Sequence, residues 1–562
     1  MIGALDFLLK LTNALIIMLW FTRSGSLTNC MISAPQPEAV EVGLEAFNRS
    51  GNVMDAAIAA ALVQTVVDPQ MCGIAGFGSM QIIRPQDGES NFIDFHGRAP
   101  LAVTSDMWEQ LIERECDDGF GFVLKGRVNE FGYTSMTTPM TLRALNHALS
   151  KYGTMSLAEV IKPAIDYCFN GFAVRPKVHA FWMQPAQAGR MERVAVVNKL
   201  PASRKIYLDD QDELLKVGDC LRNPDMGRTY QQIAEEGVEA FYSGSIADSI
   251  VADMKAHGGL LTKQDLEQCQ PTTHAPLMGS YRGFEVATNQ LPGGGLMILE
   301  MLNILECFDL NRMGHNSAAY IATVAEAMKL ATIDKDTSMG DPNFVDVPVE
   351  RLMSKPYAQT LADRIKAGEK AHVSRINSGA PESKDTTHLV VADSDGNVVN
   401  LTHSLGSSSG VITEGLGFMY NNCMMVFDPR PGQVGSLAPG KARFTAMCPT
   451  VLFRDRMPML AVGAPGGTTI TMGVLQTILN VVDFGMSAHE SVSAPRFCAT
   501  SDNIELTNRI FRSAEAELNA NGYETTRYAA SYVTPLVHAV RLMDGKLDGG
   551  ADPAGDGMAA SC

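Results

Sequence analysis

The spacing of hydrophobic residues predicts helices in the first half of the chain. Within residues 37–48, apolar positions recur at intervals of four and three, which places them on one face of a helix. Residues 53–67 are rich in alanine and apolar in nearly every direction, so this helix is expected to be buried on all sides. The same spacing predicts mainly helices between about residues 105 and 270, and another over residues 316–334.

The pattern changes to that of strands after residue 385. Residues 386–392 and 398–402 are β-branched and apolar, and Asp395-Gly396 between them supplies a tight turn, which together predict a β-hairpin. Residues 374–385, which lead into the hairpin, are polar and rich in turn-forming residues. Exposed segments of this kind are where chains tend to be cut.

Further strands are predicted at residues 451–453 and 459–462, followed by an apolar helix over residues 470–484. The glycine-rich residues 72–78 come after the buried helix and before a strand. A dinucleotide-binding loop has the opposite order, strand then helix, so we interpret these glycines as a closely packed turn. Alternating helices and strands indicate an α/β protein.

Composition and charge restrict the class of ligand. With 562 residues, 46% hydrophobic and 19% charged, the chain is globular and holds two or three domains or one large layered one. It carries 45 Lys and Arg against 62 Asp and Glu, a formal net charge of −17. This excess of acid argues against nucleic acid or an anionic membrane surface as the main partner, and suits a protein that binds small molecules.

The eleven cysteines are scattered and form no CxxC pair, which argues against a zinc site. Most stand beside apolar residues and are interpreted as buried free thiols, which favours a reducing compartment and thus the cytoplasm. Residues 1–31 complicate this interpretation, because the apolar stretch at 8–20 is interrupted by Lys10 and is too short and broken to predict a membrane span. They are either a weak leader or anchor, which would make the protein periplasmic or exported, or an over-extended start before Met31.

The search for chemistry leaves one candidate nucleophile. The eleven histidines are scattered, and the sequence has neither a GxSxG serine elbow nor a phosphate-binding loop, so we expect no metal and no cofactor. Thr386 begins the predicted hairpin. A threonine hydroxyl needs an adjacent base, and a free α-amine on the same residue would serve if the Asp385–Thr386 bond were cut. The alternative is an ordinary strand start, and the same tripeptide recurs at 272–274.

A second glycine-rich turn strengthens the catalytic interpretation. Residues 463–469 follow a predicted strand and precede an apolar helix, and the turn contains Gly466 and Gly467. Adjacent glycines at the start of a helix expose backbone N–H groups that can stabilise an oxyanion. A plain tight turn is the alternative.

These motifs, with several others in the same order, resemble the γ-glutamyltransferase (γ-glutamyltranspeptidase) family of amino-terminal-nucleophile hydrolases. The resemblance extends from about Pro35 to at least Cys498. The motifs that carry it are residues 51–57 (GNVMDAA), 94–100 (DFHGRAP), 340–346 (GDPNFVD), 386–388 (TTH), 395–397 (DGN), 421–422 (NN) and 464–467 (APGG).

The resemblance implies a four-layer αββα sandwich and a precursor that cuts itself before Thr386. The large chain, residues 32–385, and the small chain, residues 386–562, would stay together as one globular unit. Thr386 would be the nucleophile and, through its amine, the base. Ser404 matches a family threonine that hydrogen-bonds the nucleophile, and Gly466 and Gly467 match the oxyanion-binding pair.

The resemblance places the substrate on a second set of residues. The family arginine that binds the glutamyl α-carboxylate aligns with His96, and Arg98 follows two residues later, so we expect Arg98 to bind a substrate carboxylate. Thr445 aligns with one residue of a family serine pair, and Asn422 belongs to the shared Asn-Asn motif; both are expected to line the substrate site.

The chain departs from the family in the pocket for the α-amine. Val426 stands where the family has an acidic residue, Cys423 replaces a glutamine, and Ala446 replaces the second serine. A desolvated ammonium group needs an acceptor or an anion, and Val426 supplies neither. The default expectation is a γ-glutamyl (glutathione-type) donor. The alternatives are a non-glutamyl acyl amide, as in cephalosporin-acylase-like or oxamate-type relatives, and a non-catalytic single-chain relative that only binds.

Overall fold

The fold was analysed in a computed structural model of the 562-residue chain. It describes residues 30–117, 119, 121–186, 188–374, 386–532, 535–543 and 545–562. The expectations for residues 1–29 and for Asp385 therefore lie outside the described residues. In the described part, no helix is both long enough and apolar enough to cross a membrane.

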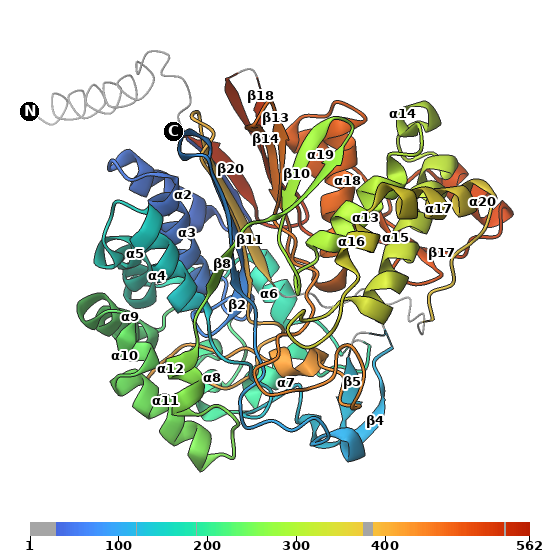
Figure 1. Cartoon of the computed structure of the whole chain (residues 1–562). Coiled ribbons are helices and arrows are strands. Elements are labelled where there is room, and N and C mark those ends of the chain that lie inside the picture. Colours follow the sequence, from blue (N-terminus) through green and yellow to red (C-terminus); the bar gives the residue numbers. More distant parts are fainter. Residues whose placement is uncertain are drawn as a thin grey trace, which may run out of the picture.

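Two antiparallel sheets form the centre of the molecule (Figure 1). The order of strands in the seven-stranded sheet is β20 (Met558–Ser561), β1 (Cys30–Ala34), β11 (Thr387–Asp393), β12 (Val398–Ser404), β2 (Phe77–Arg84), β3 (Glu89–Phe95) and β8 (Thr272–His274). The order in the six-stranded sheet is β19 (Lys546–Ala551), β18 (His538–Met543), β14 (Met457–Gly463), β13 (Thr450–Arg454), β10 (Phe284–Thr288) and β9 (Leu277–Tyr281). Each sheet contains strands from both sides of position 386.

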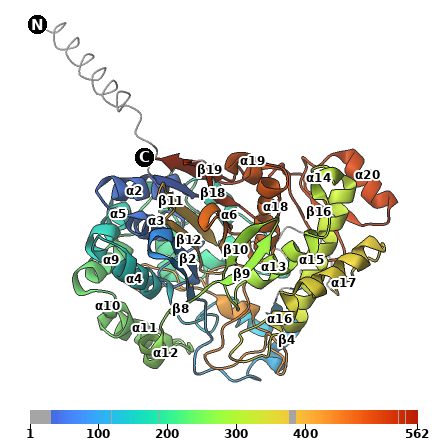
Figure 2. The same ribbon diagram turned by 45° about the horizontal axis from the view of Figure 1, so that its top comes forward.

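The sheets pack face to face and helices cover both outer faces (Figures 1 and 2). Between the sheets lies a buried apolar cluster that includes Val390, Val451 and Val540. Helices α2 (Pro37–Asn48) and α3 (Val53–Val67) cover the seven-stranded sheet, and α13 (Gly295–Leu305) and α18 (Ile470–Val482) cover the six-stranded sheet. The predicted four-layer αββα sandwich is confirmed.

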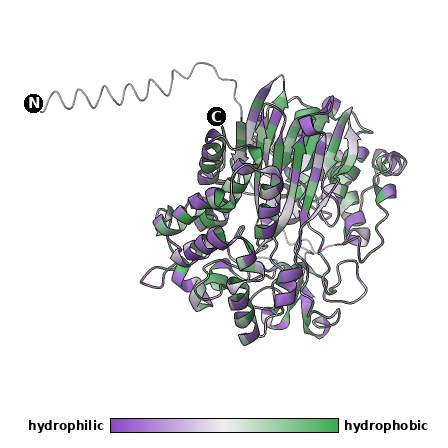
Figure 3. Ribbon diagram, turned by 60° about the vertical axis from the view of Figure 1, so that its left-hand side comes forward, coloured by the Kyte–Doolittle hydropathy of each residue, from purple (hydrophilic) through white to green (hydrophobic). Residues whose placement is uncertain are grey.

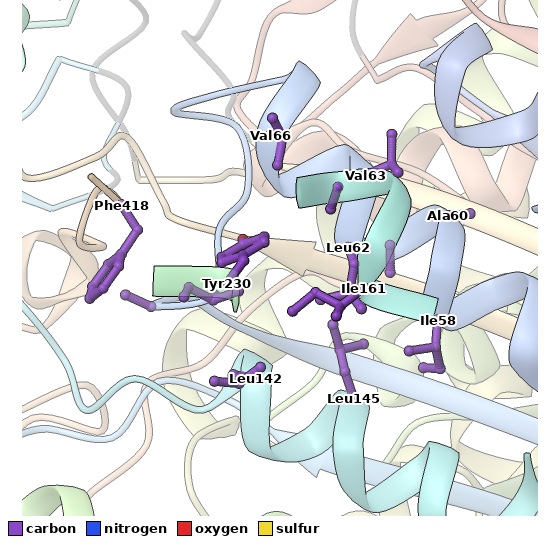
Figure 4. Packing of buried hydrophobic residues seen from close by; sticks show 14 of the residues in the cluster. Ile58, Ala60, Leu62, Val63, Val66, Leu142, Leu145, Ile161, Tyr230 and Phe418 are labelled. Atoms are coloured by element: carbon purple, nitrogen blue, oxygen red, sulfur yellow. The ribbon is translucent and has the colours of Figure 1, made fainter. Parts of the chain in front are cut away.

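Helix α3 shows how local sequence and burial agree. The Asn52 side chain caps the first turn by accepting hydrogen bonds from the backbone N–H groups of Met54 and Asp55. The Asp55 carboxylate in turn accepts a bond from the Asn52 backbone N–H, which completes a capping box. Every residue of α3 is buried, as its apolar sequence predicted. Figure 4 shows Ile58 and Leu62 of this helix packing beside residues of helices α4 (Thr141–Tyr152), α5 (Leu157–Asn170) and α9 (Pro224–Glu236).

The remaining elements surround the sandwich, and hydrophobic residues concentrate along the strands and inner helix faces (Figure 3). The helices are α6 (Pro176–Trp182), α7 (Arg193–Asn198), α8 (Pro201–Tyr207), α10 (Glu239–Tyr242), α11 (Ser245–Ala256), α12 (Lys263–Gln268), α14 (Leu310–Met313), α15 (Ala318–Ser338), α16 (Val349–Leu352), α17 (Lys355–Lys366), α19 (Ala488–Ser493) and α20 (Arg512–Ala520). Short strands form small sheets outside the core: β4 (Ile112–Glu115) with β5 (Phe122–Leu124), β6 (Phe172–Ala173) with β7 (Cys220–Leu221), and β15 (Phe497–Cys498) with β16 (Ile504–Leu506) and β17 (Thr525–Arg527).

The predicted hairpin is present as β11 and β12. Strand β11 begins and ends one residue later than predicted, and β12 extends two residues further. Gly396 in its turn has φ 84°, a left-handed conformation that glycine adopts without strain. The other Thr-Thr-His copy, Thr272–His274, is the edge strand β8, part-exposed and far along the sheet from β11.

Candidate active site

Thr386 points into the space between the two sheets, as the alternation of side chains along the hairpin indicates. Side chains alternate along a strand. The Thr387 hydroxyl faces the outer helices, where it accepts hydrogen bonds from Gln36 (2.9 Å) and Gln64 (3.2 Å). His388 faces the other sheet, since a Cβ built on Gly463 of β14 would lie 2.2 Å from its ring. Thr386 shares the side of His388 and therefore points toward the inter-sheet space.

Thr386 and Ser404 form the centre of the candidate site. Thr386 is 6% exposed and its Oγ1 donates a hydrogen bond of 3.1 Å to Ser404 Oγ, at the end of β12. Ser404 Oγ also accepts a 2.9 Å bond from the backbone N–H of Gly406, which fixes its position. The hairpin thus brings together the two hydroxyls that the sequence assigned to catalysis.

The glycine turn after β14 contains two adjacent backbone N–H groups, those of Gly466 and Gly467. Gly466 has φ 146° and Gly467 has φ 55°, so both adopt conformations that favour glycine. A Cβ on Gly466 would lie 2.6 Å from Pro535 Cβ, which makes the position intolerant of side chains. Within the described residues, no acceptor takes the N–H of either glycine. Two adjacent N–H groups in this state can receive a developing oxyanion.

His96 and Arg98, both predicted to bind substrate, gather around Asp94. His96 Nδ1 lies 2.5 Å from one Asp94 oxygen, and Arg98 Nη2 lies 3.4 Å from the other. Burial raises the pKa of Asp94, but the neighbouring His96 and Arg98 outweigh it and hold the pKa below its usual value. Arg98 Nη1 also lies 3.7 Å from Asp341, so two carboxylates already neutralise this guanidinium. His96 Nε2 is buried and makes no hydrogen bond within the described part of the chain.

Asn422 and Thr445 are both buried. Asn422 accepts a 2.6 Å bond from the Ser407 backbone and donates to the Glu130 carbonyl at 3.0 Å, so its amide holds the loop after Ser404 in place. Thr445 Oγ1 accepts a 3.3 Å bond from the Met447 backbone. The assignment of both residues to substrate binding stays a prediction.

Arg443, close to these residues, was not identified as a candidate site residue from the sequence. The Arg443 side chain donates from Nε to Cys423 Sγ at 3.1 Å, and its guanidinium carbon lies 5.2 Å from the centre of the Phe77 ring. Burial raises the pKa of Cys423 to about 11, an effect that the nearby Arg443 charge partly offsets. The sequence signal was weak, because an arginine in a polar loop is usually a surface residue.

Three buried histidines lie on strands close to Thr386: His388 and His403 on the hairpin, facing opposite sides of the sheet, and His538 on β18. His388 and His538 stack with ring centres 6.5 Å apart, and His403 Nε2 contacts Gln64 Oε1 at 2.9 Å. Burial lowers the pKa of His403 and of His538 to about 3, and that of His388 well below its usual value. All three are therefore neutral near pH 7. Among the described residues, no group of three or more His, Cys, Asp or Glu side chains is arranged to hold a metal ion.

Comparisons with known proteins agree with this geometry. A family model described as Gamma-glutamyltranspeptidase matches residues 39–562. The glutathione hydrolase proenzyme of Escherichia coli (strain K12) is 34% identical over 483 residues, which cover 83% of this chain and 80% of the relative. The acylase ACY 1 proenzyme of Pseudomonas sp. (strain V22) is 35% identical over 532 residues, 94% of this chain and 92% of the relative.

The fold is also similar to that of a solved structure. The crystal structure of cephalosporin acylase from Bacillus halodurans superposes with a TM-score of 0.84 at 27% sequence identity, and the match covers 95% of this chain and 96% of that one. The similarity therefore includes both sheets and both helical layers.

Proposed function

Because the chain belongs to the gamma-glutamyltranspeptidase family, we propose that it is a proenzyme that cuts itself before Thr386 and then hydrolyses or transfers the acyl group of an amide. The small chain would be residues 386–562, with Thr386 as its amino terminus. One observation carries this proposal: the Thr386 hydroxyl donates to Ser404 at the start of a hairpin that faces the second sheet.

Self-cleavage would proceed by attack of Thr386 Oγ on the carbonyl carbon of residue 385. The peptide nitrogen leaves as the amine of Thr386, which gives an ester, and water then hydrolyses the ester to a carboxylate and the free hydroxyl. Both sheets contain strands of both products, with β11 and β12 lying between β1 and β2 and with β13 paired to β10. The two chains would therefore stay associated after the cut.

The mature site would repeat the same chemistry on a substrate amide. Thr386 Oγ attacks the carbonyl carbon and passes its proton to the α-amine of the same residue, whose pKa lies near 8 when unperturbed. The N–H groups of Gly466 and Gly467 would receive the negative oxygen of the tetrahedral intermediate. The leaving amine takes the proton, and water or a second amine then attacks the acyl-enzyme ester and releases Thr386.

Two classes of acyl donor follow from the family. A γ-glutamyl amide such as glutathione is the default. A non-glutamyl acyl amide is favoured by Val426, which is apolar and part-buried where the sequence comparison expects a partner for the α-amine. Arg98, His96, Thr445 and Asn422 are proposed to line the site that holds either donor.

A denaturing gel tests the proposal directly. Purified wild-type protein should separate into two chains, and amino-terminal sequencing of the smaller should begin Thr-Thr-His-Leu. Thr386→Ala should give one uncut chain without amidase activity. A single chain in the wild type would support the non-catalytic, binding relative instead, and a small chain that begins at Thr272 would refute the assignment of the nucleophile.

A further inference from the structure

Arg443 lies in a segment that connects the two halves of the candidate site. On one side its guanidinium stacks on Phe77, at 5.2 Å from the ring centre. On the other side, Phe444 and Ala446 line a small cavity together with Thr468, the residue that follows the Gly466-Gly467 turn. Residues 443–446 therefore extend from Phe77 of β2, the strand next to β12, to a cavity beside the turn that would bind the oxyanion.

The register of the sheet places Arg443 on the same face as the nucleophile. Phe77 of β2 is directly opposite Ser404 of β12, and directly opposed residues in an antiparallel pair project to the same face. Ser404 is the hydrogen-bond partner of Thr386. The Thr386 hydroxyl, the Ser404 hydroxyl, the Phe77 ring and the Arg443 guanidinium thus follow one another on the inter-sheet side, over a span on the order of 10 Å.

Among the described residues, no carboxylate forms an ion pair with Arg443. Its contacts among the described residues are the Cys423 sulfur at 3.1 Å, the Phe444 carbonyl at 3.2 Å and the Phe77 ring. Arg98 differs in this respect, because Asp94 and Asp341 lie within 4 Å of it. A half-buried guanidinium with only neutral partners attracts an anionic ligand and disfavours a cation beside it.

We propose that Arg443 determines donor specificity by binding the terminal carboxylate of the acyl group, and that the preferred donors are amides of dicarboxylic acids without an α-ammonium group. The inference rests on the proposed function, because it names the substrate class of the same site. A guanidinium can hold a carboxylate through two parallel hydrogen bonds. The same positive charge would repel the ammonium of a γ-glutamyl donor, and apolar Val426 provides no anion to compensate for it.

Three anilides with the same five-carbon acyl chain isolate these effects. Glutaryl anilide carries the carboxylate, γ-glutamyl anilide carries both carboxylate and ammonium, and pentanoyl anilide carries neither. Wild-type enzyme should hydrolyse the glutaryl compound with the highest kcat/KM. Arg443→Gln should lower kcat/KM for the glutaryl compound by about ten- to a hundredfold, mainly through KM, and change the pentanoyl value by less than about threefold. Arg443→Lys should retain part of the preference, since it keeps the charge but loses the paired geometry.

Arg454 offers a matched control. Its guanidinium also stacks on a phenylalanine ring, 4.9 Å from the centre of Phe284, but it is exposed on β13 away from the Gly466 turn. Arg454→Gln should leave all three anilides unaffected. If Arg443→Gln slows the pentanoyl and glutaryl compounds equally, the arginine has a structural role and the inference is wrong.

Direct binding separates this inference from the proposed reaction. Calorimetry should detect glutarate binding to wild-type protein, about ten- to a hundredfold weaker binding to Arg443→Gln, and weaker binding of pentanoate to the wild type. If the protein cleaves itself and hydrolyses anilides but wild type and Arg443→Gln bind glutarate equally well, only the specificity assignment is overturned. Absence of both self-cleavage and hydrolysis would overturn the proposed function, and equal affinity of both proteins for glutarate would then overturn the binding role as well.

Discussion

Ser404→Ala tests whether the hydroxyl beside the nucleophile contributes to catalysis. The change removes one oxygen that accepts two hydrogen bonds, from Thr386 Oγ1 at 3.1 Å and from the Gly406 N–H at 2.9 Å. Ser404 is 1% exposed, so bulk water does not reach the position freely. In the alanine variant, both donors should therefore lack a hydrogen-bond acceptor.

The expected loss follows from these two bonds. A neutral hydrogen bond to the nucleophile contributes about 0.5–1.5 kcal/mol, and an N–H left without its partner costs about 1 kcal/mol or more. If both act on the transition state, the barrier rises by about 1.5–3 kcal/mol, which lowers kcat by roughly ten- to a hundredfold. Thr386→Ala removes the nucleophile itself and should abolish the covalent reaction.

The assay combines kcat for an acyl anilide with the time course of precursor cleavage on a gel. Ser404→Ala should slow both, because both use the same hydroxyl of Thr386. Ser404→Thr restores an oxygen and should recover most of the rate. An alanine variant within about twofold of wild type, or a threonine variant as slow as the alanine one, would refute the role given to the hydroxyl.

Three further predictions use other parts of the structure. Gly466→Ala should lower kcat by about a hundredfold or more, or prevent folding, because the φ of 146° and the neighbouring Pro535 leave no room for a side chain. Gly435→Ala is the control: its added Cβ would have its nearest contact 3.7 Å away, so it should be neutral in the same assay. Arg98→Ala should lower thermal stability, because Arg98 lies beside Asp94 and Asp341, and should raise KM for an acidic substrate less than Arg443→Gln does, with the precursor still cleaved; a larger rise in KM than in Arg443→Gln would assign the substrate carboxylate to Arg98 instead. Burial lowers the pKa of His538 to about 3, against about 6.5 in the unfolded chain, so its contribution to stability is complete above pH 6.5 and falls by about 2 kcal/mol by pH 5. Tm should therefore drop less between pH 7.5 and pH 5 in His538→Gln than in wild type. Parallel curves of Tm against pH for the two proteins would contradict this.

The sequence predicted those parts of the fold that depend on local pattern. The buried helix α3, the β11–β12 hairpin and the strand–glycine turn–helix unit around Gly466 all follow from periodicity and turn residues. The four-layer arrangement came from the family resemblance, because periodicity does not reveal which strands pair across hundreds of residues. The pairing of β1 with β20, at opposite ends of the described chain, is such a case.

The site was predictable where one short segment carries the chemistry and not where distant segments meet. Thr386, Ser404 and the two glycines were identified from the hairpin, the turn and the resemblance. Arg443 was missed because its importance depends on Phe77 and Cys423, which are remote in sequence and become neighbours only in the fold. The two carboxylates around Arg98 were only partly foreseen: Asp94 is four residues away, whereas Asp341 comes from a different part of the chain.

Identity to relatives does not separate the two classes of donor. The relative named as a glutathione hydrolase and the one named as an acylase match this chain at 34% and 35% identity, so overall identity favours neither class of donor. Thr386 immediately precedes β11 and the Gly466-Gly467 turn follows β14, and the positions of these strands are fixed by a buried core. Cys423, Val426 and Arg443 instead lie in loops or a short 3₁₀ turn between strands β12 and β13, outside the strands of the two sheets. Donor choice can therefore change while the reaction is kept, and the charge at position 443 is a more informative guide to the substrate than overall similarity.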